Sequence, residues 1–222
     1  MNKIFTFIRS LFKQFFIILL YLVIVIGLQL LLYRYLDCSN PILEGSAYLF
    51  IELFTMLIFI IIFRKILIPD IIDFKKNGKQ YIKDNYKYWL YGLLVMAISN
   101  IIISYFIGLA TNEASNRDML VSIPIFSIIS MVVCAPVVEE LMTRVILKDK
   151  VSNIVYYSLS GLIFGSLHLL SATSLNEVFY VIPYGALGFA FAVIYKKSNN
   201  VCTNIFFHAL HNSIAVLLIL IG

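Results

Sequence analysis

The sequence predicts an all-α fold, a polytopic bundle of transmembrane helices, because its composition is strongly apolar and its apolar runs are long. Of the 222 residues, 61% are hydrophobic and only 13% are charged. A soluble domain of this size carries more polar surface, so we expect a membrane protein. Seven apolar runs are each long enough to cross a bilayer; they cover residues 15–36, 47–67, 89–109, 119–147, 154–170, 178–195 and 201–221.

The first of these runs follows a short basic stretch that contains Lys3, Arg9 and Lys13. No small-residue cleavage site follows the run, so we expect an uncleaved first transmembrane helix and not a signal peptide. No linker or internal repeat divides the chain. We therefore expect a single membrane domain over residues 1–222, with the N-terminal spans within residues 15–109.

The basic residues predict the topology. With the N-terminus in the cytoplasm, 15 of the 17 Lys and Arg residues fall on the cytoplasmic side, and Arg34 and Arg117 fall outside. Cytoplasmic loops carry an excess of Lys and Arg, so we expect a multi-pass protein of the cell membrane whose C-terminus lies outside. The topology also accounts for the net charge of +5, so no nucleic-acid partner is expected. The abundance of Ile, Lys and Asn is typical of a bacterial protein.

The segment between the second and third runs has a pattern of its own. Apolar residues from Ile71 to Trp89 recur at roughly helical spacing, and lysines from Lys75 to Lys87 lie on another stripe. This pattern fits a basic amphipathic helix on the anionic cytoplasmic leaflet. A solvated charged loop is the alternative, because Gly78 weakens a helix.

Few reactive side chains lie before residue 130. Glu52 is the exception in the first three runs, and it sits near the outer end of its run, where water could reach it. The three cysteines, Cys38, Cys134 and Cys202, are scattered and form no CxxC pair. They indicate neither a disulfide framework nor a thiolate metal site.

Two adjacent carboxylates and an arginine lie inside the fourth apolar run. On a helix, Glu140 and Arg144 are i,i+4 neighbours and can neutralise each other. Glu139 points about 100° away from Glu140 and has no partner within a turn. Charged side chains at membrane depth are costly and usually face a protein-lined or water-filled cavity. Glu139 is therefore the first candidate for a functional residue.

All three histidines lie in the last third of the chain, and each is in an apolar run. His168 comes one helical turn after Phe164, and the small residues Gly161 and Gly165 allow another helix to approach closely. A packed helix would hold the imidazole in a fixed orientation. A hydrogen bond to a neighbouring helix explains a lone transmembrane histidine equally well.

The last run carries a polar stripe. Asn204, His208 and Asn212 are spaced four residues apart and share one helix face, and His211 lies beside them. Four polar groups on one half of a membrane helix are expected in a bundle interior. They could line a functional cavity or form an interhelical hydrogen-bond seam.

These runs supply a carboxylate, imidazoles and an amide, which are the groups that hydrolysis of an amide bond by activated water requires. Glu139 can take a proton from the water and deliver one to the leaving amine, while His168 polarises that water. His208 and Asn212 can donate hydrogen bonds to the oxygen of the tetrahedral intermediate. A zinc site of Glu139, His168 and His208 is the rival chemistry, although HExxH is absent. We favour a metal-free reaction that requires no cofactor.

Three motifs, in this order on late runs, resemble those of the CPBP family: Glu139-Glu140-x-x-x-Arg144, Phe164-x-x-x-His168 and His208-x-x-x-Asn212. This family comprises CAAX proteases and bacteriocin-processing enzymes, and it is also called the Abi or lysostaphin-resistance-protein-A-like family of intramembrane endopeptidases. The resemblance covers a core of about residues 118–216. The earlier runs carry no signature of the family.

The resemblance implies a CPBP-type, CAAX prenyl protease 2-like intramembrane endopeptidase. In such an enzyme Glu139 and His168 would activate water, and His208 and Asn212 would form the oxyanion pocket. Supporting roles are expected for Glu140, Arg144, Phe164 and His211. The expected partners are a membrane-associated peptide or protein substrate and the lipid bilayer.

Two other functions stay open at this point. A non-catalytic protein of the same family, acting in bacteriocin self-immunity or regulation, would bind a receptor, kinase or transporter without cleaving it. A small proton-coupled transporter would also use buried carboxylates and histidines. The sequence shows no inverted repeat and no pair of broken helices, which disfavours the transporter.

The candidate residues fall at different depths in their runs. At 1.5 Å per residue, His208 lies roughly 10 Å and Glu139 roughly 12 Å from the cytoplasmic ends of their runs, and His168 lies roughly 20 Å from its own. The groups meet only if helices are offset or tilted. Pro136 is a candidate cause, because proline removes a hydrogen bond and permits a kink. The site is then expected in the cytoplasmic half of the membrane.

Overall fold

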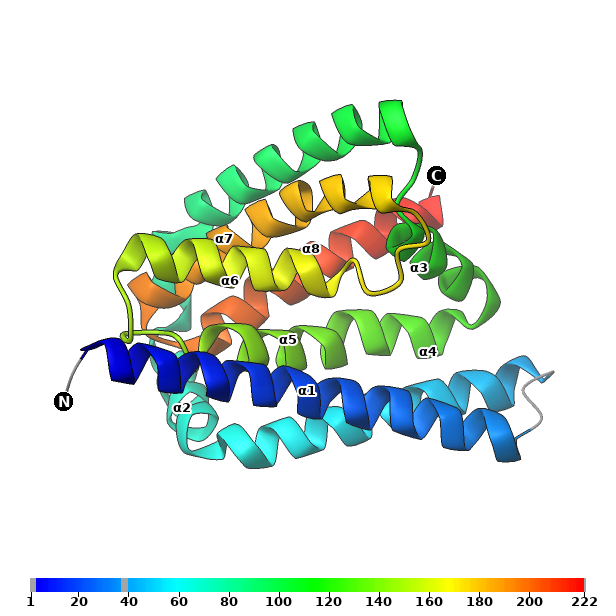
Figure 1. The fold of residues 1–222 in the computed structure, drawn as a ribbon, viewed down its shortest axis with the longest axis horizontal. Coiled ribbons are helices and arrows are strands. Elements are labelled where there is room, and N and C mark those ends of the chain that lie inside the picture. Colours follow the sequence, from blue (N-terminus) through cyan, green and yellow to red (C-terminus); the bar gives the residue numbers. More distant parts are fainter. Residues whose placement is uncertain (1–2, 37–39, 222) are drawn as a thin grey trace.

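The computed structural model describes residues 3–36 and 40–221, and within these ranges it contains helices and no strand (Figure 1). In chain order the elements are α1 (Lys3–Tyr35), α2 (Pro41–Ile107), α3 (Thr111–Ser122), α4 (Pro124–Ile129), the π-helix η1 (Ser130–Cys134), α5 (Ala135–Arg144), α6 (Asn153–Leu167), the 3-10 helix η2 (Leu175–Tyr180), α7 (Val181–Ser198) and α8 (Val201–Ile221).

The helices have the length and composition of membrane spans, which confirms the predicted all-α membrane bundle. In the described part of the chain, five helical stretches are long and apolar enough to cross a bilayer: Phe5–Tyr35, Pro41–Ile107, Pro124–Arg144, Leu175–Ser198 and Val201–Ile221. The number differs from the seven expected runs for two reasons. Helix α2 contains two of those runs, and α6, with 15 residues, is apolar but shorter than the other spans.

Helix α2 is 67 residues long and bends sharply. In Figure 1 its first part lies beside α1, turns at the end of the bundle where α1 begins, and returns along the far side of α7. Pro69 lies inside the helix, and a proline removes one helical hydrogen bond and permits a kink. Residues 68–88 are helical, so the amphipathic helix describes this segment better than the loop, and Gly78 does not interrupt it.

Helix α7 lies inside the bundle and packs against α6, the second half of α2, and α8. Aromatic residues from all four helices form a buried cluster there: Trp89, Phe164, Phe191 and Phe207. Phe164 and Phe191 of this cluster pack against Arg144 of α5 and His208 of α8, so these polar residues are shielded from lipid on that side.

Close contact between α6 and α7 depends on glycine. A Cβ atom on Gly161 would lie 2.7 Å from the carbonyl oxygen of Gly185, and a Cβ on Gly165 would lie 2.8 Å from that of Val181. These distances are too short for any side chain, so the small residues allow the two backbones to touch. His168 is three residues beyond Gly165, and this contact therefore fixes its position relative to α7.

Helix α1 lies at the edge of the bundle, against the first half of α2 and against α5. Its buried side chain Gln14 donates a hydrogen bond to the carbonyl oxygen of Met142 in α5, at 2.9 Å. The beginning of α1 and the end of α8 lie at opposite ends of the bundle (Figure 1).

Two of the three cysteines lie in the part of the chain that the structure describes. Cys134 and Cys202 are free thiols. Cys38 lies outside the described residues.

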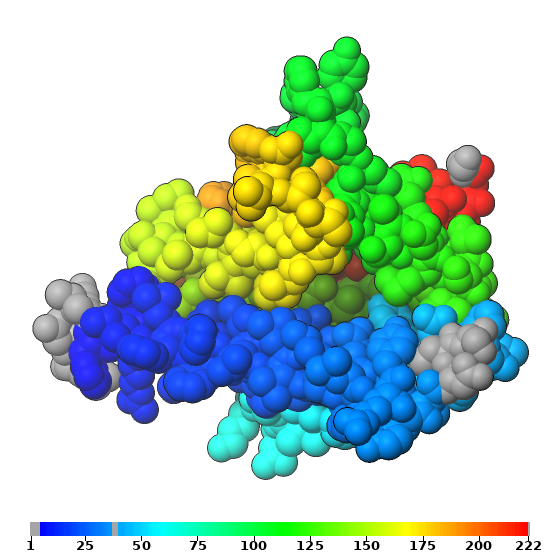
Figure 2. All heavy atoms as spheres, turned by 45° about the vertical axis from the view of Figure 1, so that its right-hand side comes forward, coloured from blue at the N-terminus to red at the C-terminus, as the bar shows by residue number. Residues whose placement is uncertain are grey.

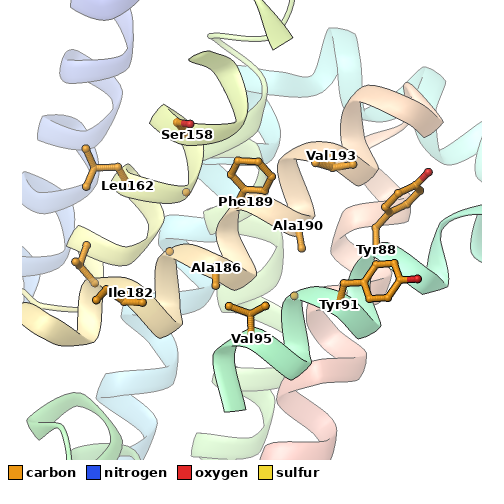
Figure 3. A pocket seen from close by; sticks show the side chains of 14 residues that line it. Tyr88, Tyr91, Val95, Ser158, Leu162, Ile182, Ala186, Phe189, Ala190 and Val193 are labelled. Atoms are coloured by element: carbon orange, nitrogen blue, oxygen red, sulfur yellow. The ribbon is translucent and has the colours of Figure 1, made fainter. Parts of the chain in front are cut away.

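An apolar groove of about 600 Å³ opens between the second half of α2, α6 and α7 (Figure 3). Tyr91, Val95, Leu162, Ile182 and Phe189 point toward it. Its walls are hydrocarbon and aromatic rings, as expected for a surface that faces lipid tails in a membrane protein.

Candidate active site

The helix that carries Glu139 begins with a π-helical turn. The expected fourth run, 119–147, is divided into α3, α4, η1 and α5, and the irregularity lies just before Pro136. The N–H of Ala135 donates to the carbonyl of Ser130, five residues back. The carbonyl of Met131 would normally accept a hydrogen bond from residue 135 or 136. The N–H of Ala135 is already used, and Pro136 has no N–H. The side-chain amide of Asn212, on α8, donates to this carbonyl instead at 2.7 Å.

Glu140 and Arg144 form a fully buried ion pair on α5. The Nε of Arg144 lies 2.8 Å from Oε2 of Glu140, and Nη2 lies 3.1 Å from Oε1. The remaining Nη1 donates to the hydroxyl of Ser160 on α6 at 2.6 Å. The guanidinium also lies over the rings of Phe164 and Phe191. A charge pair with this many hydrogen bonds is the form in which ions are tolerated in an apolar interior.

Glu140 also binds two side chains of α8. Asn204 donates to its Oε2 at 3.0 Å, and Nδ1 of His208 lies 3.0 Å from its Oε1. Both oxygens therefore have two partners each, which fills the accepting capacity of a carboxylate. Glu140 acts as a structural anchor that ties α5 to α8 and fixes the ring of His208.

Glu139 faces both of the other candidate imidazoles. Its Oε2 lies 3.9 Å from Nε2 of His168 and 3.9 Å from Nε2 of His208. Among the described residues, this oxygen has no hydrogen-bond partner although it is buried. Both distances are too long for a direct hydrogen bond and suit a bridging water molecule.

Each imidazole is held by its other nitrogen. Nδ1 of His168 lies 2.9 Å from the carbonyl oxygen of Phe164, one turn earlier, and the ring stacks on Tyr184 of α7 with centroids 4.7 Å apart. The ring of His208 stacks on Phe191 with centroids 5.1 Å apart. Carbonyl and carboxylate oxygens accept hydrogen bonds, so Nδ1 carries a proton in both histidines. Nε2 of each ring is thereby directed at Glu139.

The charges around Glu139 do not cancel. Glu139 and Glu140 each carry a negative charge when ionised, and Arg144 supplies one positive charge. A net charge of −1 therefore remains inside the bundle, and a buried charge needs compensation. His208 lies between the two carboxylates, with Nε2 toward Glu139 and Nδ1 toward Glu140.

These groups border a polar cavity of about 440 Å³. Glu139, His168, His208 and Asn212 all line it. The remaining walls come from α1, the first half of α2, α3, and the residues after α6. Figure 2 shows this face of the molecule hollowed between α1, α3 and the segment near residue 170, with α8 visible at the bottom of the hollow.

The sequence predicts that His168 lies at a different membrane depth from Glu139, but the offset between α5 and α6 removes this difference. Ser160 contacts both Thr143 and Arg144, and the hydroxyl of Tyr156 donates to the carbonyl of Arg144. The first turn of α6 therefore lies beyond the end of α5, as Figure 1 also shows. This offset brings His168 to the level of Glu139.

The structure thus brings together Glu139, His168 and His208 and places Asn212 on the same cavity. Glu140, Arg144 and Phe164 lie directly behind them. His211 is partly buried on α8, and it is not one of the described residues that line the cavity.

Two contacts of the site could not be read from motif spacing. Tyr184 of α7 stacks on His168, and Ser160 of α6 binds Arg144. Ser160, Phe164 and His168 are spaced four residues apart on one face of α6, so this spacing could have identified Ser160. Tyr184 belongs to none of the three motifs, and its contact with His168 depends on how α6 and α7 pack.

The arrangement does not match a zinc site. Two ligands of tetrahedral zinc, each 2.0–2.1 Å from the metal, lie about 3.3 Å apart, whereas Glu139 lies 3.9 Å from each imidazole. Within residues 3–36 and 40–221, no group of three His, Cys, Asp or Glu side chains is placed so that it could hold a metal ion.

Comparison with known proteins agrees with the motifs. Residues 121–214 match the family model described as type II CAAX prenyl endopeptidase Rce1-like. A Bacillus subtilis (strain 168) protein named "Putative membrane peptidase YdiL" is 27% identical over 124 residues, which cover 52% of this chain and 48% of that protein. An uncharacterized protein of Mycoplasma capricolum subsp. capricolum is 29% identical over 173 residues, covering 67% of this chain and 49% of that protein. No solved structure matches the chain.

The fold is that of a multi-pass membrane protein, and the comparisons relate residues 121–214 to a family of membrane proteases. The match of residues 121–214 to the Rce1-like, type II CAAX prenyl endopeptidase family model agrees with the resemblance seen in the three motifs. The chain spans about half the length of the two curated relatives.

Proposed function

We propose that this protein is an intramembrane endopeptidase that hydrolyses a peptide bond of a membrane-associated peptide or protein. One observation carries the proposal: the buried Oε2 of Glu139 lies 3.9 Å from Nε2 of both His168 and His208, at the wall of a polar cavity. Three such groups around one point can hold and activate a water molecule. The family of residues 121–214 supports the same chemistry.

In the proposed reaction, a water molecule donates one hydrogen bond to Glu139 and one to Nε2 of His168. Glu139 takes a proton as the water oxygen bonds to the scissile carbonyl carbon, which produces a tetrahedral oxyanion. His208, protonated at both nitrogens, and the second N–H of Asn212 donate hydrogen bonds to that oxyanion. The C–N bond then breaks, and Glu139 delivers its proton to the leaving amine. The products are a carboxylic acid and an amine.

Glu140 and Arg144 would support this reaction without touching the substrate. Glu140 stabilises the protonated ring of His208, and Arg144 offsets the charge of Glu140. Since Nε2 of the ring faces Glu139 while Nδ1 is held by Glu140, the imidazole cannot rotate without losing a buried hydrogen bond.

The distribution of Lys and Arg places the end of the bundle where α1 begins in the cytoplasm. Lys196, in the last turn of α7, forms an ion pair with Asp149, which follows α5. The cavity walls from α3 and from the residues after α6 lie at the opposite end, so we propose that the cavity opens toward the outer side of the membrane and not toward the cytoplasmic half expected from the sequence. A peptide entering through the hollow seen in Figure 2 would reach Glu139 without crossing the aromatic cluster.

The test compares membrane peptides from cells that express the wild-type protein, Glu139→Gln or Glu44→Gln. Glu44 is a carboxylate of α2 that does not belong to the described lining of the cavity, so its variant controls for loss of a membrane carboxylate. We expect one or more cleaved peptides in wild-type and Glu44→Gln cells and their absence in Glu139→Gln cells. Unchanged products in Glu139→Gln cells would reject the peptidase. A phenotype that survives Glu139→Gln would favour the non-catalytic immunity or regulatory protein.

A further inference from the structure

We propose that Glu52 recognises a positively charged group of the substrate, a Lys or Arg side chain or a free N-terminus, and so makes the enzyme selective for cationic peptides. This inference rests on the proposed peptidase function, because it assigns a substrate class to the same cavity. Glu52 lies outside residues 121–214, in the part of the chain that the family model does not match.

Glu52 lines the same cavity as Glu139. Tyr48, one turn earlier on α2, also lines it, and its hydroxyl accepts a hydrogen bond from Ser130 of η1 at 3.0 Å. This bond fixes the face of α2 that carries both residues against the segment that leads into the catalytic helix. Glu52 is thereby held in the wall of the active-site cavity and not on the lipid surface.

No interaction within the described residues accounts for the charge of Glu52. It has no hydrogen bond or ion pair to another described side chain. A carboxylate at membrane depth is costly, and it usually marks a substrate pathway or pairs with a cation. The described cavity lining contains no Lys or Arg that could be that cation.

The charges of the catalytic groups sharpen this conclusion. Arg144 is occupied by Glu140, and the described lining of the cavity holds the carboxylates of Glu52 and Glu139 with no Lys or Arg beside them. A substrate that brings a positive charge would complete the balance, whereas an acidic peptide would be repelled. A hydrogen bond to a charged group in such a site supports a preference of roughly 10-fold to 100-fold.

Binding to a protein that cannot cleave tests this inference separately from catalysis. The Glu139→Gln protein, in nanodiscs, is titrated with acetylated 20-residue apolar peptides that carry Lys, norleucine or Glu at successive positions. A matched set with a free N-terminus and no Lys distinguishes a terminal ammonium from a side chain. Binding is measured by fluorescence anisotropy in the Glu139→Gln background alone and with Glu52→Gln, Glu52→Lys or Glu44→Gln added.

We expect at least one Lys or free-amine peptide to bind at least tenfold more tightly than its norleucine or acetylated counterpart. Addition of Glu52→Gln should abolish this preference, addition of Glu52→Lys should transfer it to the Glu peptide, and Glu44→Gln should leave it unchanged. Equal binding of cationic and neutral peptides, or a preference that survives Glu52→Gln, would overturn the inference. Cleavage of the same peptides by the wild-type protein reports on the peptidase itself, so the two hypotheses can fail independently.

Discussion

Arg144 and Glu140 are in contact at 2.8 Å with both side chains completely buried. The pair lies four residues apart on α5, and it links α5 to Ser160 of α6 and to His208 of α8. One ion pair therefore connects the three helices that carry the candidate catalytic groups. Its removal should affect both the fold and the site.

Arg144→Ala is expected to destabilise the protein strongly. It leaves the carboxylate of Glu140 buried without its counterion, and breaking a buried pair in this way costs about 3–5 kcal/mol. Arg117→Ala is the matched control, because Arg117 pairs with Glu113 at the same spacing and the same 2.8 Å but is about half exposed. Its loss should cost less than about 1 kcal/mol. Thermal unfolding in detergent measures both, and similar effects of the two variants would contradict the structural role of Arg144.

Gly165→Ala should separate α6 from α7. Its new Cβ would lie 2.8 Å from a backbone oxygen of Val181, which no rotation of a side chain can relieve. We expect a loss of about 1–3 kcal/mol in stability together with reduced cleavage, since His168 is on the displaced turn. Gly27→Ala has open space around its Cβ and should be neutral or slightly stabilising. Equal stability of the two variants in a thermal-unfolding assay would rule out the glycine contact.

Tyr184 is expected to position His168 through ring stacking. Tyr184→Leu removes the aromatic partner and should lower kcat by roughly 2-fold to 10-fold, corresponding to about 0.5–1.5 kcal/mol for an aromatic pair. Tyr184→Phe keeps the ring and should retain most of the activity. If Phe and Leu at this position reduce kcat equally, the hydroxyl and not the stacking is what matters.

Chelators are expected to leave cleavage unchanged. The distances of 3.9 Å between Glu139 and the two imidazoles do not fit tetrahedral zinc. Purified protein would be treated with EDTA and then with 1,10-phenanthroline, and its activity measured before and after addition of zinc. Loss of activity that zinc restores would show that the site closes around a metal.

Local periodicity predicted the helices and the i,i+4 relation of Glu140 and Arg144, because both depend on residues close together in the chain. It also singled out Glu139, since a lone carboxylate in an apolar run is costly wherever it lies. It could not show that Glu140 binds His208, or that Glu52 shares a cavity with Glu139, because these contacts depend on how distant helices pack.

The boundaries of the spans were less predictable than their existence. Residues 119–147 look like one apolar run, yet Pro124 and Pro136 divide it, and a π-helical turn lies between them. In the opposite direction, two apolar runs and the basic segment between them form the single bent helix α2. Hydropathy indicates which segments can lie in the lipid bilayer, but it does not indicate where the backbone hydrogen bonds of a helix are interrupted.

Cleavage by purified Glu139→Gln protein in proteoliposomes tests the central claim most directly. The substitution keeps the size of the side chain but removes the group that accepts the proton from water. With a peptide that the wild-type protein cuts, we expect kcat to fall by roughly 10²- to 10⁴-fold, with thermal stability close to that of the wild type. Cleavage by a well-folded Glu139→Gln protein at the wild-type rate would contradict the assignment of Glu139 as the base.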